Sequence, residues 1–138
     1  MTEIMELPPR PTLEQIQAFE SILRQFPQVD CPVDHFFADG LYGRLVLIPA
    51  GTTVTGKMHA GRHLNVLLAG TIKVTTEQGV IELTAPHVMV SEAGVKRVGH
   101  AYTDTLWLTV HASDKTDIAE LEKELIIPEH PALEGESP

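Results

Sequence analysis

Between about residues 41 and 111 the sequence alternates apolar and polar residues in short runs rich in Val, Ile, Leu and Thr. Alternation with a period of two is typical of strands that bury one face, and Gly, Pro or Asp interrupts the runs every few residues. This number and spacing of strands favour an all-β jelly roll or small barrel, because closure removes exposed strand edges. The pattern predicts about eight strands, near 42–49, 52–58, 63–69, 71–75, 79–83, 86–91, 96–102 and 105–111.

Helical patterns flank this β region on both sides. Thr12 and Gln15 form a capping-box pattern ahead of apolar residues that recur every three or four positions until Pro27, which predicts an amphipathic helix. The stretch after the last strand returns to helical spacing, and the acidic, proline-rich end of the chain predicts a mobile tail. Four parts are therefore expected: an N-terminal segment with the helix (1–30), the β-barrel (31–112), a C-terminal helix (113–127) and an acidic mobile tail (128–138).

Charge and cysteine content narrow the possible partners. The 138 residues include one cysteine, Cys31, and carry a formal net charge of -9. Because phosphate binding depends on clustered Lys and Arg, neither nucleic acid nor an anionic membrane surface is an expected partner. The single cysteine, with no secretory signal and no apolar run long enough to cross a bilayer, predicts a cytoplasmic protein.

Two histidines frame the clearest candidate site. His59 and His63 lie on either side of Ala60-Gly61-Arg62, a sequence that predicts the turn of a β-hairpin. Imidazoles on opposite arms of a hairpin converge on a metal ion if both side chains point to the same face. The pair alone could equally be two ordinary histidines, but His100, in a later strand-like stretch, would supply a third nitrogen.

The spacing around these histidines resembles the first motif of the cupin family, which reads Gly, five residues, His-x-His, three or four residues, Glu, six residues, Gly. Gly51 and Gly70 match its two glycines, and His59 matches its second histidine. His63 stands where the family has glutamate, and Lys57 stands where it has the first histidine. The resemblance covers the whole β region. It implies a double-stranded β-helix, the cupin jelly-roll barrel, with a divalent transition metal (Fe, Zn, Mn, Ni or Cu) inside.

The second cupin motif, Gly, five residues, Pro-x-Gly, two residues, His, three residues, Asn, matches less well. Glu92-Ala93-Gly94 stands for Pro-x-Gly, and Arg97 occupies the histidine position. Arg97 and His100 point to opposite faces of a regular strand, so His100 points inward only through a bulge, for which Gly99 is suited. We favour His100 as the third ligand because a guanidinium cannot coordinate a metal. The opposite choice, Arg97 inward beside Lys57, would give a metal-free anion pocket.

Several further residues have an expected place. His111 has the strand parity to reach the interior but is expected to be an ordinary strand-end histidine, and His35 is expected in a loop outside the barrel. Trp107 and Phe36-Phe37 are expected in the core or in an interface, since large aromatics supply buried area. The polar residues expected to border the pocket and bind the ligand are Lys57, Asn65, Arg97 and Tyr102.

A site of three neutral histidines adds no ligand charge and leaves the metal Lewis acidic, with open positions for water or substrate. By resemblance, cupins of this kind include non-haem iron dioxygenases, while others are isomerases, lyases or plain binding domains, and the fold does not choose among them. We expect a small metal-binding protein that binds or converts a small polar molecule in the barrel, and that forms a symmetric homodimer. The alternatives are a metal-free module that sequesters an anionic ligand, and a structural or assembly protein.

Overall fold

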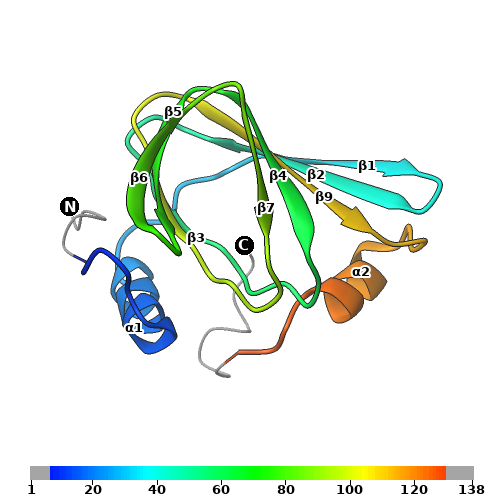
Figure 1. The fold of residues 1–138 in the computed structure, drawn as a ribbon, viewed down its shortest axis with the longest axis horizontal. Coiled ribbons are helices and arrows are strands. Elements are labelled where there is room, and N and C mark those ends of the chain that lie inside the picture. Colours follow the sequence, from blue (N-terminus) through cyan, green and yellow to red (C-terminus); the bar gives the residue numbers. More distant parts are fainter. Residues whose placement is uncertain (1–6, 130–138) are drawn as a thin grey trace.

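Two antiparallel sheets packed face to face form the body of the molecule (Figure 1). The computed structural model describes residues 7–129, so most of the tail predicted at 128–138 lies outside the described residues. The elements in chain order are α1 (Leu13–Leu23), β1 (Val33–Ala38), β2 (Leu41–Ile48), β3 (Thr53–Thr55), β4 (His63–Ala69), β5 (Thr71–Thr76), β6 (Gly79–Thr84), β7 (His87–Ser91), β8 (Val98–Ala101), β9 (Thr105–Ala112) and α2 (Ile118–Leu125). Sheet A has the order β1-β2-β9-β4-β7, and sheet B has the order β3-β8-β5-β6.

The strands confirm most of the predicted β pattern, with two differences. β1 was not predicted, because it is an edge strand in which only Val33 is even partly buried, so its sequence has no buried face to reveal it. The predicted hairpin around Ala60-Gly61 is wrong. β3 pairs with β8 in sheet B, whereas β4 pairs with β7 and β9 in sheet A, so the turn connects two sheets.

Both predicted helices are present. Thr12 and Gln15 form the capping box that begins α1, and Ile16 and Phe19 pack against Val98 on the outer side of sheet B. The C-terminal helix was predicted to begin at residue 113, but α2 begins at Ile118. Asp117 caps it, because its side chain accepts a hydrogen bond from the amide of Glu120. Within the described residues, no helix is both long and apolar enough to cross a membrane.

The inner face of sheet A changes character along its strands. Ile48 and Leu67 join the apolar core between the two sheets. Toward the other ends of the same strands, the inward positions are occupied by Tyr42, His63 and His111, all buried. The barrel is therefore filled with apolar side chains at one end and with polar rings at the end that faces α2 (Figure 1).

The chain after α2 covers this polar end. Ile126 forms a β-bridge with His59, the amide of Ala60 donates to the carbonyl of Leu125 at 2.8 Å, and the amide of Ile127 donates to Met58 at 2.9 Å. The segment is fastened further along by Glu129, which forms an ion pair with Lys96. Backbone pairing thus places His59 beside the C-terminal segment.

Candidate functional site

Three imidazole rings meet inside the end of the barrel that faces α2. His59 precedes β4, His63 begins β4 and His111 lies near the end of β9. The ring centroids are 4.4 Å apart for His59 and His63, 4.8 Å for His59 and His111, and 4.6 Å for His63 and His111. We call these three residues the histidine cluster.

Strand register brings two of the rings together. β4 and β9 are antiparallel neighbours in which Leu64 pairs with Val110, so His63 and His111 are the next residues along the same register. Their side chains share the inner face because neighbouring residues alternate between faces. His59 reaches the same place through its bridge to the C-terminal segment.

Burial keeps the cluster uncharged. Desolvation lowers the pKa of His59 to about 3, with further lowering by His63, His111 and Arg44. It lowers the pKa of His111 to about 4 in the same way. The pKa of His63 is also lowered by burial, although the hydrogen bond to the Gly61 carbonyl opposes the shift. Neutral imidazoles keep a nitrogen lone pair, which is what a metal ion or a hydrogen-bond donor requires.

The ring nitrogens of the cluster have few partners. Nδ1 of His63 lies 3.1 Å from the carbonyl oxygen of Gly61, which can only accept, so Nδ1 carries the proton and Nε2 is left as an acceptor. Among the described residues, no hydrogen bond involves a ring nitrogen of His59 or His111. The cluster therefore presents acceptor nitrogens that no described group uses.

Tyr42 and Arg44 complete this end of the barrel, and neither was predicted. The Tyr42 ring stacks on His111 with centroids 6.1 Å apart, and its hydroxyl lies 2.6 Å from Nδ1 of His35. Arg44 is two residues further along the inner face of β2, and burial is the main cause that lowers its pKa. No described carboxylate forms an ion pair with Arg44, although Glu122 of α2 influences its pKa.

Asn65 belongs to a polar wall of the barrel. Its side-chain amide donates to Ser91 Oγ at 2.6 Å and accepts from Trp107 Nε1 at 3.2 Å. Asn65 is buried, and Trp107 packs against the core as predicted. These bonds hold the inner faces of β4, β7 and β9 together beside the histidine cluster.

Arg97 also faces this wall, but its guanidinium is already occupied. It donates to Ser91 Oγ at 3.1 Å and to the carbonyl of Thr75 at 2.9 Å, and it pairs with Glu77 at 3.0 Å. Arg97 lowers the pKa of His63, which places its charge near the cluster. Arg97, which stands at the histidine position of the second cupin motif, thus links β5 and β7 through hydrogen bonds.

The structure does not bring His100 to His59 and His63. β8 pairs with β3 and β5 in continuous register, so the predicted bulge at Gly99 is absent. Gly99 faces the core, where a Cβ would lie 3.1 Å from Cδ1 of Ile72. His100 shares the opposite face with Val98, and its Nδ1 lies 2.7 Å from Thr53 Oγ1.

Tyr102 and Lys57 are the two other residues predicted to border the pocket. Tyr102 is exposed, its ring is edge-on to His100, and its amide bonds to Thr71 at the opposite end of the barrel. Lys57 is half-buried two residues before His59 and makes no side-chain hydrogen bond or ion pair within residues 7–129.

The cluster fits a metal ion in donor chemistry and spacing but not in ring orientation. Three imidazoles that bind one ion through nitrogens at about 2.1 Å have ring centres roughly 4.5–5.5 Å apart, close to the spacing of the cluster. As the side chains stand, the described residues contain no group of three or more His, Cys, Asp or Glu placed to hold a metal ion. The rings are inclined to one another by 30–56°. Because no such group is in place among the described residues, coordination would require the side chains to turn until one nitrogen of each ring faces the ion.

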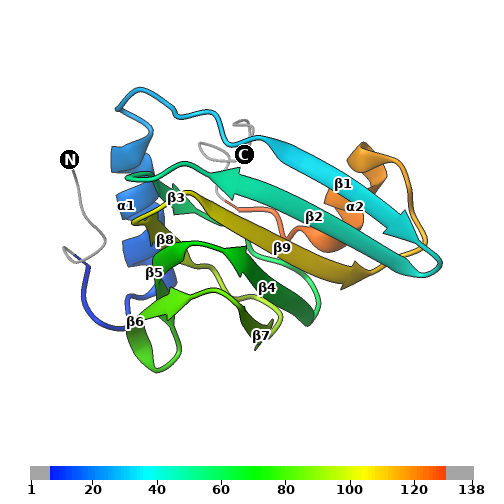
Figure 2. The same cartoon turned by 90° about the horizontal axis from the view of Figure 1, so that it is seen from above.

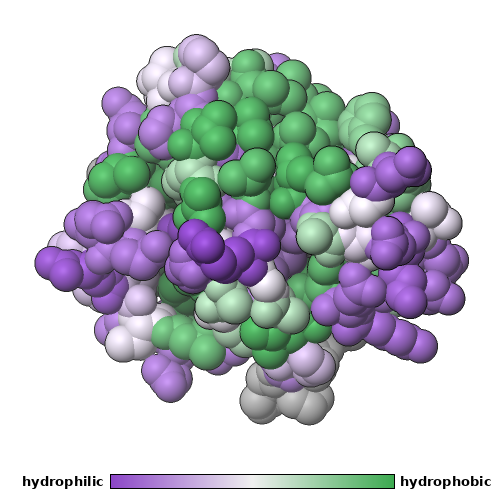
Figure 3. Space-filling view, turned by 45° about the vertical axis from the view of Figure 1, so that its right-hand side comes forward, coloured by the Kyte–Doolittle hydropathy of each residue, from purple (hydrophilic) through white to green (hydrophobic). Residues whose placement is uncertain are grey.

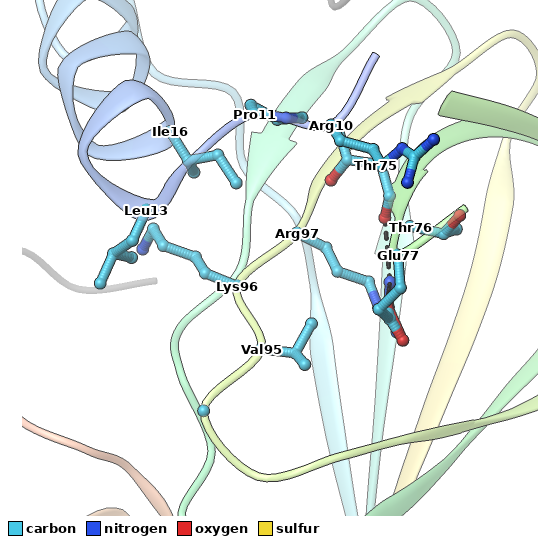
Figure 4. A pocket seen from close by; sticks show the side chains of 11 residues that line it. Arg10, Pro11, Leu13, Ile16, Thr75, Thr76, Glu77, Val95, Lys96 and Arg97 are labelled. Carbon is cyan, nitrogen blue, oxygen red and sulfur yellow. Dashed lines mark hydrogen bonds and ion pairs between the residues drawn. The ribbon is translucent and has the colours of Figure 1, made fainter. Parts of the chain in front are cut away.

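A separate hollow of about 220 Å³ lies between the N-terminal segment and the loop before β8 (Figure 4). It has three cationic residues in its lining, Arg10, Lys96 and Arg97. Carboxylates already pair with two of these, since Lys96 is bound by Glu20 and Arg97 by Glu77. The hollow is therefore a weaker anion site than the end of the barrel.

Comparison with known proteins identifies the fold. Sequence comparison with protein-family models and with curated proteins finds no match. Among solved structures, the Cnp3 cupin domain of Schizosaccharomyces pombe is 18% identical, with a TM-score of 0.51 and coverage of 70% of this chain and 75% of that chain. The cupin domain of an XRE family transcriptional regulator from Enterobacter cloacae is 8% identical, with a TM-score of 0.52 and coverage of 62% and 98%. The chain has the cupin fold.

The same cupin fold is found in enzymes. An acetylacetone dioxygenase from Acinetobacter johnsonii is 16% identical, with a TM-score of 0.50 and coverage of 63% of this chain and 65% of that chain. Identities this low show the fold alone. They confirm the predicted class, an all-β jelly-roll barrel with an N-terminal and a C-terminal helix.

Within this cupin fold, the sequence pointed to two of the three clustered histidines and missed the third. His111 shares its strand parity with Thr105, Trp107 and Thr109, all of which face the interior. That parity was the available signal. It could not show that β9 lies next to β4, which is what brings His111 opposite His63.

Proposed function

We propose that this cupin-fold protein binds a divalent transition metal at the histidine cluster and holds a small polar molecule, an anion, beside it. The observation that carries the proposal is the packing of three neutral imidazoles within 4.8 Å of one another, with the ring nitrogens of His59 and His111 unused within the described residues. A shared metal ion would use these nitrogens together.

The proposed ligand set keeps His59 and His63 and takes His111 in place of His100. All three rings are uncharged at neutral pH because burial lowers their pKa values, so a cation would not have to displace protons from them. A bound ion of Fe, Zn, Mn, Ni or Cu would supply a Lewis acid whose charge the three neutral histidine ligands do not reduce.

Arg44 supports an anionic ligand at the same place. Its guanidinium is half-buried, forms no ion pair with a described carboxylate, and lies close enough to lower the pKa of both His59 and His111. A buried guanidinium is costly without an anion, and carboxylates suit its paired donors. Arg44 would therefore orient a small carboxylate toward the rings, while α2 and the segment after it restrict access of water.

Metal content tests the ligand set. The full chain is incubated separately with each of the five metals, freed of excess ion and analysed by elemental analysis. We expect about one ion per chain for at least one metal, and roughly tenfold or greater loss of affinity in His59→Ala and His111→Ala. His100→Ala is the matched control, since it removes a buried histidine that lies on the outer side of sheet B, away from the cluster. Absence of bound metal in the wild type, or a loss as large in His100→Ala, would contradict the proposal.

A metal-free carboxylate-binding module is the second candidate. The observation that favours it is that Arg44 forms no ion pair with a carboxylate of residues 7–129. Calorimetric titration with oxalate, with and without chelator, separates the two functions. Arg44→Gln should weaken oxalate binding in either case, while Arg62→Gln, which removes an exposed guanidinium paired with Glu92, should not. Equal oxalate affinity before and after metal removal would favour the metal-free module. No oxalate binding under either condition would count against the anion part of both candidates.

A further inference from the structure

The outer face of sheet A is almost entirely apolar. Along β2, β4, β7 and β9, every residue that points away from the barrel is Leu, Val, Gly or Ala. On β1 the outward residues are Asp34, Phe36 and Ala38, so Asp34 is the one charged residue on this face of the described sheet. Strands that meet water on one face normally alternate apolar and polar residues. Here the face that points away from the barrel lacks the polar residues that such a water-facing side would carry.

This face lies open in the described structure. Seen from above in Figure 2, β1, β2, β9 and β4 lie in front and neither helix crosses them. Figure 3 shows the consequence, hydrophobic side chains gathered over the upper part of the molecule. Phe36 is 55% exposed and Val88 is 60% exposed, at opposite edges of the sheet.

A hollow of about 380 Å³ lies within the face. Gly43 leaves a gap there, which Phe36, Leu41, Leu68 and Leu108 surround. Projecting leucines and an adjacent apolar hollow on one surface can interlock with the same features of a second, inverted copy, as a two-fold interface requires.

The size of the face suits association of two copies. Five strands about 4.8 Å apart and five to eight residues long cover roughly 500–600 Å². Two such faces together would remove roughly 1,000–1,200 Å² from water, which reaches the lower limit for a specific interface. Two sheets that stack through such faces pack about 10 Å apart with strands nearly aligned, as in β-sandwiches.

Charge disfavours other occupants. An amphipathic membrane-binding surface carries Lys and Arg beside its apolar face, whereas this chain has a net charge of -9 and no cation on the face itself. A charged peptide would find only Asp34 to pair with. A second copy brings an uncharged apolar surface of matching extent.

We infer that two copies of this chain associate through the outer faces of sheet A, with side chains of one copy filling the Gly43 hollow of the other. The inference is independent of the histidine cluster, which occupies the inner face of the same strands.

Sedimentation velocity of the full chain at micromolar concentration tests the inference. We expect a species of twice the chain mass of 15.1 kDa. Leu68→Glu and Val88→Glu should each give a monomer with at least a tenfold weaker dimerisation constant. Two variants are used so that a folding defect in one, detected by circular dichroism, does not decide the outcome. Val29→Glu is the matched control, because Val29 is 53% exposed and lies outside the sheet.

A monomeric wild type would overturn the inference, as would a dimer that persists in both folded variants. A monomer that floats with phosphatidylcholine vesicles would assign the face to a lipid surface instead. If the Val29→Glu control also dissociates, the charge alone is the cause and the inference fails.

Discussion

The imidazole rings of His59 and His111 lie 4.8 Å apart, although one precedes β4 and the other comes from the last strand of the barrel. Their contact depends on two separate pairings, that of β4 with β9 and that of His59 with the C-terminal segment. Neither ring is charged at neutral pH, because burial lowers both pKa values.

Lowering the pH should destabilise the metal-free protein. In the unfolded chain the imidazoles take up protons as the pH falls through 6.5, but in the folded chain His111 stays neutral until about pH 4 and His59 until about pH 3. The unfolded state therefore binds more protons in this window, and the folded state loses stability as the pH falls. The loss at pH 5, relative to pH 7.5, is about 2 kcal/mol for each of the two residues.

Urea unfolding at these two pH values in the presence of chelator measures the effect. The double variant His59→Gln, His111→Gln should lose most of the pH dependence, while His87→Gln, outside the cluster, should retain it. Equal pH dependence in the wild type and the double variant would show that the cluster is not the source.

Removing Lys96 should strongly destabilise the fold. The Lys96 side chain is 1% exposed, and its ammonium group forms ion pairs with Glu20 at 3.2 Å and with Glu129 at 3.0 Å. Lys96→Met leaves two buried carboxylates uncompensated, at a cost of about 3–5 kcal/mol. The control Arg62→Met breaks an exposed pair with Glu92 and should cost less than about 1 kcal/mol. Thermal unfolding compares the variants, and equal losses would contradict the importance of burial.

Substitution of Gly70 should be poorly tolerated. Gly70 has a positive φ of 92°, and a Cβ there would lie 2.4 Å from the carbonyl oxygen of Asp104. Gly70→Ala combines backbone strain with overlap against the backbone and should cost roughly 3 kcal/mol or more. Gly61→Ala, where a Cβ would meet nothing within 4 Å, is the control and should change the free energy of unfolding little. A small effect at both positions would contradict the close packing of the turn after β4.

Most strands could be predicted from the sequence, because the alternation of apolar and polar residues that marks a strand is a local pattern. The range predicted for β4 coincides with His63–Ala69, and Thr12 with Gln15 marked the start of α1 correctly. β1 was missed because an exposed edge strand need not alternate apolar and polar residues. The hairpin around Gly61 was wrongly predicted because adjacent strands in sequence can belong to different sheets, and that depends on long-range pairing.

The site was harder to predict for the same reason. His59 and His63 were found from their spacing, but the third ring depended on which strand lies beside β4. From the sequence, a bulge at Gly99 was expected to turn His100 into the barrel. In the structure β8 has no bulge, and Gly99 makes room for the side chain of Ile72 in the core. Tyr42 and Arg44 carry no motif, and only the inward side of β2 places them at the cluster.

The central claim is that His59, His63 and His111 share one metal ion. The most direct measurement is an anomalous difference map from crystals of the full chain grown with zinc. The account predicts a peak at about 2.1 Å from one ring nitrogen of each of the three histidines, with the rings turned toward it. A peak that includes His100 in place of His111 would contradict it, as would no peak at the cluster with zinc or with any of the other four metals in excess.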